Sequence, residues 1–168
     1  ISGKKKCELL YRLVKYLNPD KILELGTSLG ISTAYIHAGN SEAEIKSIEA
    51  DSSLIDLAAS HLNDKIELMQ GIFDEILPDL AEKYNPDFIY VDGDHRSESL
   101  LRYIEQILKS HREEKCFVID DIYWSEDMSN GWQKLIADKR FGISIDLYHF
   151  GLLFTRQKQP KQHFNLRL

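Results

Sequence analysis

The sequence predicts a doubly wound α/β fold, and two observations lead to this prediction. Apolar, strand-like runs alternate with segments of helical periodicity along most of the chain, and two further strand-like runs, 142–149 and 151–157, are separated by a short turn. Parallel strands are joined by helical crossovers, so the alternation gives five strand–helix units, and the last two runs give an antiparallel pair. We therefore expect a Rossmann-like, mostly parallel seven-stranded sheet with a C-terminal antiparallel hairpin and helices on both faces.

The predicted elements follow one another through short connections. A first helix over 7–17 ends at Asn18-Pro19, a pair that stops helices. No repeat or linker interrupts the alternation, so residues 1–168 are expected to form one domain, with an N-terminal helix within 1–20 and a tail over 157–168 that either adds an edge strand or docks elsewhere. The chain begins with Ile1, which suggests that upstream residues are missing. The expected strands are 21–25, 44–50, 65–71, 86–94 and 115–121, and the helices behind them are 30–39, 52–62, 73–84, 97–111 and 125–140.

Composition and charge argue against several classes of protein. The net charge is −6 and the pI is near 5.5, whereas nucleic-acid binders present a basic face. No apolar run approaches the roughly 20 residues of a membrane span, and no secretory signal pattern opens the chain. Cys7 and Cys116 have no metal-binding or redox spacing. We expect a cytoplasmic protein without nucleic-acid or membrane partners, and interpret the basic Gly3–Lys6 stretch as a solvated lead-in to the first helix.

Acidic and small residues follow each predicted strand at its carboxyl end. In doubly wound sheets, ligands bind outside this edge, near the point where the strand order reverses. The chemistry of the protein is therefore expected here. In strand order, the candidates are Glu24, Gly26 and Gly30, then Glu49, then Gly71, Phe73 and Asp74, then Asp92, Asp94 and His95, and finally Asp120 and Asp121.

The glycine turn after the first strand argues against two kinds of nucleotide. A phosphate-binding NTPase loop needs G-x-x-x-x-G-K-[ST], but Gly26 and Gly30 are one residue too close and Ile31 stands where the lysine would follow. A dinucleotide fold has G-x-G-x-x-G, and Ser28 occupies the position of the middle glycine. Glu24 would also bring negative charge close to a diphosphate. A nicotinamide-dependent oxidoreductase is therefore the less favoured alternative.

The pattern E-x-G-x-x-x-G instead suits a nucleoside cofactor with positive groups and no phosphates, as in S-adenosylmethionine. A carboxylate such as Glu24 favours the sulfonium and ammonium charges of that cofactor. Glu49, at the end of the second strand, can accept hydrogen bonds from both ribose hydroxyls. The two glutamates together favour S-adenosylmethionine as the cofactor.

Three motifs make the chain resemble class I S-adenosylmethionine-dependent methyltransferases over Ile22 to about Arg156. "ILELGTSLGIS", "IKSIEAD" and "FIYVDGDHRSE" are similar to motifs of the small O-methyltransferases of the catechol and caffeoyl-CoA type. The single domain is then a methyltransferase domain. The resemblance implies that Glu24, Gly26, Ser28, Gly30 and Ser32 line the methionine end, that Glu49 binds the ribose, that Ala50 touches the adenine, that Gly71, Phe73 and Asp74 border the adenine edge, and that Asp92 lies in the cleft.

The same resemblance implies a divalent metal, because metal-dependent members of the group hold an ion that binds the hydroxyls of the acceptor. Asp92, Asp120 and Asp121 fall at the ligand positions, and carboxylates suit Mg²⁺ or Ca²⁺. The third ligand is commonly asparagine in the group, whereas this chain has Asp121. Paired aspartates after a strand can also cap a helix.

His95 falls where the relatives carry a lysine base, and histidine is a suitable general base at neutral pH. Its alternative role is to cap the following helix or face solvent. Asp92 shares the expected catalytic site. Tyr123 and Trp124 are candidate walls for an acceptor, whereas the other large residues of the fifth unit are predicted to form a core-facing helical stripe, namely Met128, Trp132 and Leu135.

We therefore expect a methyltransferase that acts on an oxygen of a small molecule. The place after the fourth strand lacks the Asn/Asp-Pro-Pro-aromatic motif of enzymes that methylate nucleic-acid amino groups. A protein that binds the cofactor without turnover, or that has another class of acceptor, is the remaining alternative, and a homodimer is left open.

Overall fold

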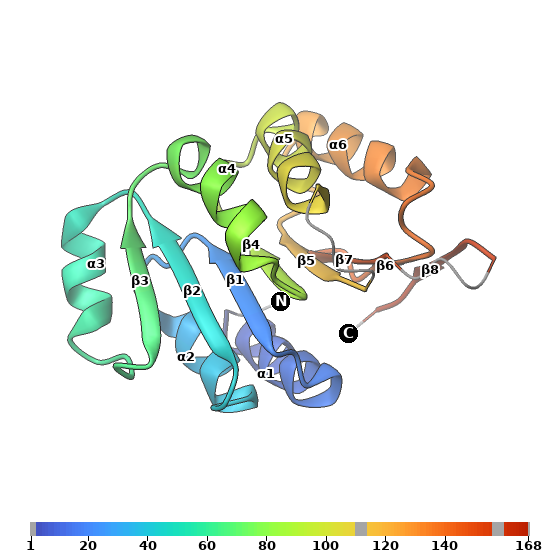
Figure 1. Ribbon diagram of the computed structural model, residues 1–168. Coiled ribbons are helices and arrows are strands. Elements are labelled where there is room, and N and C mark those ends of the chain that lie inside the picture. The colour runs from blue at the N-terminus through green and yellow to red at the C-terminus, as the bar shows by residue number, and fades with distance from the viewer. Residues whose placement is uncertain (1–2, 110–113, 156–159, 168) are drawn as a thin grey trace.

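The computed structural model describes residues 3–109, 114–155 and 160–167. Within them a single sheet separates two layers of helices, with α1 and α2 on one face and α4, α5 and α6 on the other (Figure 1). The helices are α1 (Gly3–Leu17), α2 (Ile31–Gly39), α3 (Ser52–Ala59), α4 (Phe73–Tyr84), α5 (Ser97–Leu108) and α6 (Glu126–Ala137). The strands are β1 (Lys21–Leu25), β2 (Glu44–Glu49), β3 (Ile66–Gln70), β4 (Phe88–Val91), β5 (Cys116–Asp120), β6 (Ile143–Asp146), β7 (Phe150–Phe154) and β8 (Gln162–Asn165).

The strand order confirms the doubly wound class and corrects the strand count. The order is β3-β2-β1-β4-β5-β7-β6-β8, with parallel pairing from β3 to β5 and antiparallel pairing of β7 with both β5 and β6. The order reverses between β1 and β4, so the loops after these strands flank the crevice where ligands bind in such folds. Residues 156–159, at the end of the predicted hairpin and the start of the tail, lie outside the described residues.

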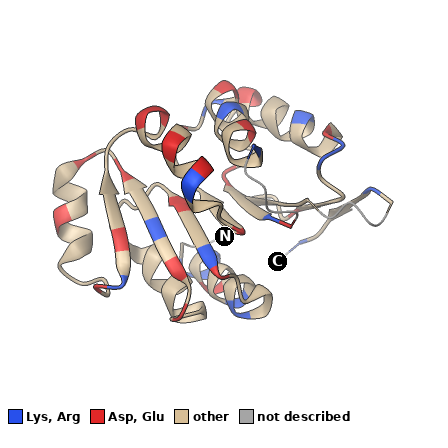
Figure 2. Ribbon diagram, in the orientation of Figure 1, with Lys and Arg blue, Asp and Glu red and all other residues tan. Residues whose placement is uncertain are grey.

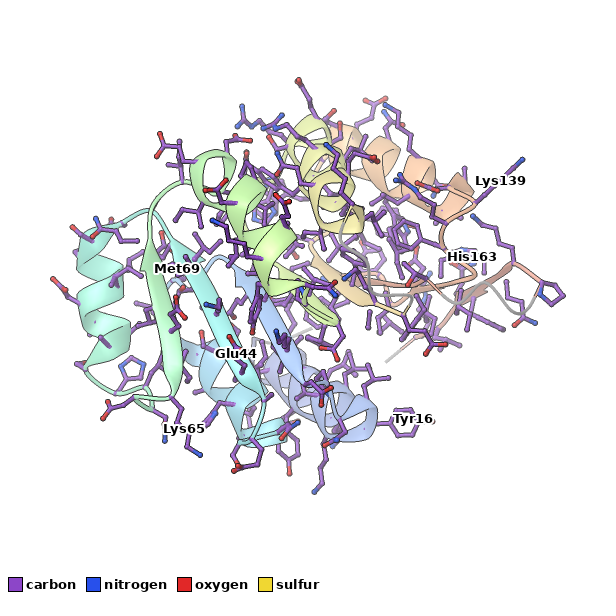
Figure 3. The ribbon with its side chains drawn as sticks, in the orientation of Figure 1. Tyr16, Glu44, Lys65, Met69, Lys139 and His163 are labelled. Atoms are coloured by element: carbon purple, nitrogen blue, oxygen red, sulfur yellow. The ribbon has the colours of Figure 1, made fainter. Side chains whose placement is uncertain are left out.

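The eighth strand comes from the predicted tail. β8 pairs in parallel with β6, and His163 lies within 2.9 Å of the hydroxyl of Ser144 (Figure 3). All four residues of β8 are exposed and only Phe164 among them is apolar, so the segment has no hydrophobic alternation. The expectation of seven strands was therefore wrong by one edge strand that hydropathy does not reveal.

Alternation along the strands decides which side chains face which layer. Ile22 belongs to the apolar cluster under α1 and α2, whereas Leu23 and Leu25 belong to the cluster under α4 to α6. Because successive residues of a strand point to opposite faces, Glu24 faces the layer of α1 and α2. Tyr90 belongs to the same cluster as Ile22, and Asp120 lies two residues beyond Val118 of that cluster. The face covered by α1 thus carries the polar residues of three strands.

The predicted core stripe on α6 is confirmed for three residues. Met128, Trp132 and Leu135 are buried, and the indole N–H of Trp132 donates to Asp146 at 3.2 Å. Trp124 is 69% exposed and does not belong to this stripe. Its side chain is therefore accessible at the surface, as a contact with an acceptor would require.

The outer faces of the helices are polar. Acidic and basic residues are interspersed on α1 and on α4 to α6 (Figure 2), and Tyr16 projects from α1 away from the sheet (Figure 3). None of the helices in the described ranges is long and apolar enough to cross a membrane.

Candidate active site

The loop after β1 is held against two neighbouring strands. The N–H groups of Gly26 and Thr27 donate to the carbonyl of Ile48, at 3.0 and 3.2 Å, and the N–H of Asp92 donates to the carbonyl of Leu25. Gly26 has φ +107°, and a Cβ there would overlap the backbone carbonyl of Asp92. Only glycine combines this conformation with this close approach. The glycine of the turn is thus required by the junction of β1 with β4.

Glu24 lies beneath this loop and is fully buried. Its carboxylate accepts hydrogen bonds from the hydroxyls of Ser32 at 2.6 Å, Ser47 at 2.7 Å and Thr33 at 2.5 Å. Burial raises the pKa of Glu24 to about 7, against the opposing effect of these three hydrogen bonds. Ser32, which lines the neighbouring cleft, stands between this carboxylate and the open space. Glu24 therefore acts on the cleft through Ser32 and not by direct exposure.

Glu49 ends β2 and is fixed by the backbone around it. Its Oε2 accepts the N–H of Ser28 at 2.9 Å, and its Oε1 accepts the N–H groups of Ala50 at 2.8 Å and Asp51 at 3.1 Å. The residue is half-buried, and Ala50 beside it is exposed. Three backbone donors thus orient one carboxylate at the carboxyl edge, and each of its oxygens retains acceptor capacity for a ligand.

The residues expected at the adenine edge divide into two groups. Phe73 packs edge-on against Tyr103, with ring centroids 5.5 Å apart, and its ring closes on Gly93 of the loop after β4. The carboxylate of Asp74 instead binds Arg102 of α5 at 2.7 and 2.9 Å. Gly71 remains half-buried, and its N–H donates to the carbonyl of Glu49 at 2.9 Å. The loop after β3 is thus tied to Glu49, whereas Asp74 is engaged in an ion pair.

A cleft of about 580 Å³ opens between the loop after β1 and the start of α1, a volume within the range of ligand pockets. The hydroxyl of Tyr90 lies at its floor, 3.0 Å from Oδ2 of Asp92 and 3.2 Å from Oδ2 of Asp120. Burial and the nearby carboxylates raise the pKa of Tyr90, which keeps it a phenol. The cleft is lined by Gly3, Lys4, Lys6, Cys7, Thr27, Ser28, Leu29, Ile31, Ser32, Tyr35, Tyr90, Asp92, Asp120 and Asp121.

The predicted metal site is occupied by a lysine. The ammonium of Lys6 lies 2.6 Å from Oδ1 of Asp120 and 2.8 Å from Oδ1 of Asp121, so the interpretation of Gly3–Lys6 as solvated was wrong for this residue. Burial opposes the charged form of Lys6, but hydrogen bonds to both aspartates outweigh it and raise its pKa. Burial and the charge of Asp92 raise the pKa of Asp120 to about 6, against the effect of Lys6.

The expected Mg²⁺ or Ca²⁺ site therefore does not fit these residues. No group of three His, Cys, Asp or Glu residues in the described part of the chain is arranged to hold a metal ion. In addition, the oxygens of Asp120 already accept hydrogen bonds from Lys6, from Tyr90 and from the N–H of Asp121. Asp92, Asp120 and Asp121 do gather at one cleft, but around an ammonium group and a phenol.

His95 lies beside the cleft and outside its lining. It is half-buried, and its ring centroid is 5.6 Å from that of the exposed Trp124, with the two planes tilted by 33°. The neighbouring Asp94 binds Arg96 and Tyr103; these hydrogen bonds, led by that of Arg96, lower its pKa to about 2 against the effect of burial. His95 thus stacks on an aromatic wall next to a fixed ion pair.

Sequence reasoning missed Lys6 and Tyr90. Tyr90 could have been found, since alternation along β4 puts it on the same face as Glu24. Lys6 could not, because it is 114 residues from Asp120 in sequence and only the packing of α1 brings them together.

Known proteins resemble the chain over most of its length. The O-methyltransferase hkm8 of Aspergillus hancockii is 25% identical over 154 residues; the match covers 84% of this chain and 58% of that protein, so the chain spans little more than half of the curated relative. The O-methyltransferase from Bacillus cereus, solved in complex with SAH, is 24% identical with a TM-score of 0.75, and the match covers 92% of this chain and 81% of that one.

A second solved structure has a similar fold. The O-methyltransferase TomG from Streptomyces achromogenes, in complex with SAM, is 20% identical with a TM-score of 0.76 and matches 92% of this chain and 80% of its own. The family model described as a methyltransferase domain matches residues 23–122, a span from β1 to just beyond β5. Because this match extends over more than half of the chain, the protein belongs to the methyltransferase-domain family.

Proposed function

We propose that this protein is an S-adenosylmethionine-dependent methyltransferase that methylates an oxygen of a small-molecule acceptor. Membership of the methyltransferase-domain family supports the reaction class. The name of the Aspergillus relative supports oxygen as the acceptor atom, and the Bacillus and Streptomyces structures, solved with S-adenosylhomocysteine (SAH) and S-adenosylmethionine (SAM), support the cofactor.

The observation that carries the proposal is the fixed carboxylate of Glu49 beside a turn without basic residues. Three backbone N–H groups orient this carboxylate, which suits two neutral ribose hydroxyls and would repel a phosphate. The turn from Glu24 to Thr33 contains no lysine or arginine to hold a phosphate. The residues therefore fit a nucleoside cofactor without phosphates.

The remaining cofactor contacts follow the strand ends. Gly26, Ser28, Gly30 and Ser32 would hold the methionine end, with Glu24 acting through Ser32. Ala50, Gly71 and Phe73 would border the adenine. Asp74 is bound to Arg102, so its contribution would come from its backbone position and not from its carboxylate. Asp92, which lines the cleft and is braced by Tyr90, would lie between cofactor and acceptor.

When bound, S-adenosylmethionine would supply a methyl group from its sulfonium sulfur to the acceptor oxygen, with S-adenosylhomocysteine as the leaving group and the acceptor proton passing to a base. The protein has to hold the acceptor in line and take that proton. We assign the proton to Asp92, which lines the cleft, or to His95, three residues later in the loop after β4 and outside that lining. A pH–rate profile of the Asp92→Asn and His95→Asn proteins decides between them.

Calorimetry with SAM, SAH and NAD tests the proposal. We expect SAM and SAH to bind and NAD not to bind. Glu49→Ala removes a charged acceptor of two ribose hydroxyls and should weaken SAM binding by about tenfold or more. Glu67→Ala, on the neighbouring exposed edge of β3, is the matched control and should leave the affinity unchanged.

Three results would contradict the proposal. Binding of NAD without a response to either sulfur nucleotide would indicate an oxidoreductase. SAM affinity that is the same for Glu49→Ala and the unaltered protein would move the ribose site elsewhere. Tight SAM binding without methylation in an acceptor screen would favour a binding protein without turnover.

A further inference from the structure

The Lys6 ammonium sits at the position where the predicted metal ion would have been. It bridges Asp120, the last residue of β5, and Asp121, the residue that follows it, and lies on the lining of the cleft. The side chain of Lys6 is 18% exposed and that of Asp120 is 5% exposed, so the ion pair is largely shielded from water. A shielded and doubly hydrogen-bonded ammonium is held in place more firmly than a surface lysine.

This ammonium retains a donor for a ligand. A lysine ammonium has three N–H groups, and Asp120 and Asp121 account for two of them. The ring of Phe150 lies beside it, with its centroid 5.6 Å from Nζ, and among the described residues only Asp120 and Asp121 accept hydrogen bonds from Nζ. The third donor is therefore available at a cleft whose other walls include Tyr35, Leu29 and Ile31.

We propose that Lys6, and not a divalent metal, is the cation that binds the acceptor oxygen in this protein. The inference rests on the proposed methyltransferase function and names the group that receives the acceptor. The ammonium can donate a charge-assisted hydrogen bond to the acceptor oxygen, and such a bond is stronger to an oxyanion than to a neutral hydroxyl. The acceptor class that matches this site is a phenol or another acidic hydroxyl compound with an apolar body.

The carboxylates give this lysine a different role from that of a lone base. Asp120 and Asp121 keep it charged, and Tyr90 links Asp120 to Asp92 through one hydroxyl. The ammonium is thus built into a polar chain that runs across the floor of the cleft. A divalent ion could enter only by displacing Lys6 from both aspartates.

The first arm of the test uses the metal alone. Mg²⁺, Mn²⁺ or Ca²⁺ is titrated into the unaltered protein in a calorimeter, after SAH binding has been verified. No saturable heat is expected. A one-to-one isotherm with any of these ions would overturn the inference, while a failure of SAH to bind would contradict the proposed function itself.

The second arm uses 4-nitrophenol, whose ionised form has its own visible absorbance. The probe is titrated into protein saturated with SAH, and the bound phenolate is measured. Lys6→Met should weaken phenolate binding by about tenfold, the loss of one charge-assisted hydrogen bond. Lys6→Arg retains the charge and should restore most of the binding. Lys5→Met, on the exposed side of the same turn of α1, is the matched control and should have no effect.

Thermal unfolding of each variant verifies that it is folded. Equal phenolate binding by the unaltered and Lys6→Met proteins, including the absence of measurable binding to both, would overturn the inference. Because SAH binding is measured first, that outcome would leave the proposed cofactor site standing.

Discussion

The two halves of the proposed site, a cofactor half around Glu24 and Glu49 and an acceptor half around Lys6 and Asp120, are built on different principles. In the cofactor half, the interacting groups are close in sequence: Ser32 is eight residues from Glu24, and Ser28 is 21 residues from Glu49. In the acceptor half, Lys6 meets Asp120 across 114 residues. Motif chemistry can be recognised where neighbouring segments of the sequence supply all the groups. Where a separate helix completes the site, the same motifs are compatible with several chemistries.

The halves also differ in how they neutralise a buried carboxylate. Glu24 is surrounded by hydroxyls, and its pKa is raised to about 7 by burial. Asp120 is paired with an ammonium and a phenol, and its pKa is raised to about 6 by burial and the charge of Asp92. Isolated charges are costly inside a protein. The cofactor half meets this cost with hydrogen bonds from hydroxyls and a raised pKa, and the acceptor half meets it with a countercharge.

Gly26→Ala should have the largest effect and tests whether the cofactor half depends on a single backbone junction. The new Cβ would overlap the rigid carbonyl of Asp92 at φ +107°. We expect a loss of about 3 kcal/mol in the free energy of unfolding, together with loss of SAM binding. Urea unfolding and calorimetry measure both quantities. Gly3→Ala, where a Cβ meets nothing within 4 Å, is the control for the change in stability. A stable Gly26→Ala protein with unchanged SAM affinity would show that the close approach of β1 and β4 does not require glycine at this position.

The Glu24 carboxyl predicts a pH dependence of stability. Its pKa rises from 4.5 to about 7 on folding, so the folded state holds a proton that the unfolded chain has lost. The stabilisation is fully present below pH 4.5 and is lost as the pH rises through about 7, by about 3 kcal/mol in all. Asp120 contributes with the same sign. For Glu24→Gln, the free energy of unfolding should therefore depend less steeply on pH between pH 4.5 and 7 than it does for the unaltered protein.

Glu67→Gln, at an exposed position on β3, is the control for this slope and should titrate like the unaltered protein. A Glu24→Gln protein with an unchanged slope would assign the proton to another group. In that case a raised pKa of Glu24 would no longer distinguish the cofactor half from the acceptor half.

Much of the fold follows from the sequence because it is encoded locally. Buried runs such as "FIYV" and turns such as Asn18-Pro19 mark strands and helix ends without reference to the rest of the chain. The strand beyond the expected seven, β8, is fully exposed and pairs with β6 through its backbone. Its side chains therefore show no pattern from which a strand could be predicted. Strand pairing of this kind depends on the neighbouring edge and not on composition.

The site follows from the sequence to a smaller extent. The positions of Glu24 and Glu49 at strand ends were predictable from the parallel topology. Whether Asp120 and Asp121 hold a metal or a lysine depends on where α1 packs, and its hydropathy pattern fixes only which face is buried. The engagement of Asp74 by Arg102 also depends on the relative placement of two helices. The residues around Asp74 in the sequence do not indicate that a side chain of another helix will bind its carboxylate.

Trp124→Ala should have the smallest effect, and it tests whether the acceptor half extends to the His95–Trp124 pair. The indole is 69% exposed and stacks at 5.6 Å on His95, so its removal should change the free energy of unfolding by less than about 0.5 kcal/mol. SAM affinity should not change, because Trp124 is not among the residues proposed to hold the cofactor. Binding of 4-nitrophenol to the SAH complex should weaken by about threefold to tenfold if this wall faces the acceptor. Trp124→Phe should retain most of the binding, and Tyr16→Ala, on the far side of α1, should match the unaltered protein (Figure 3). A Trp124→Ala protein with full phenolate affinity would confine the acceptor to the cleft under Lys6 and leave the His95–Trp124 pair outside it.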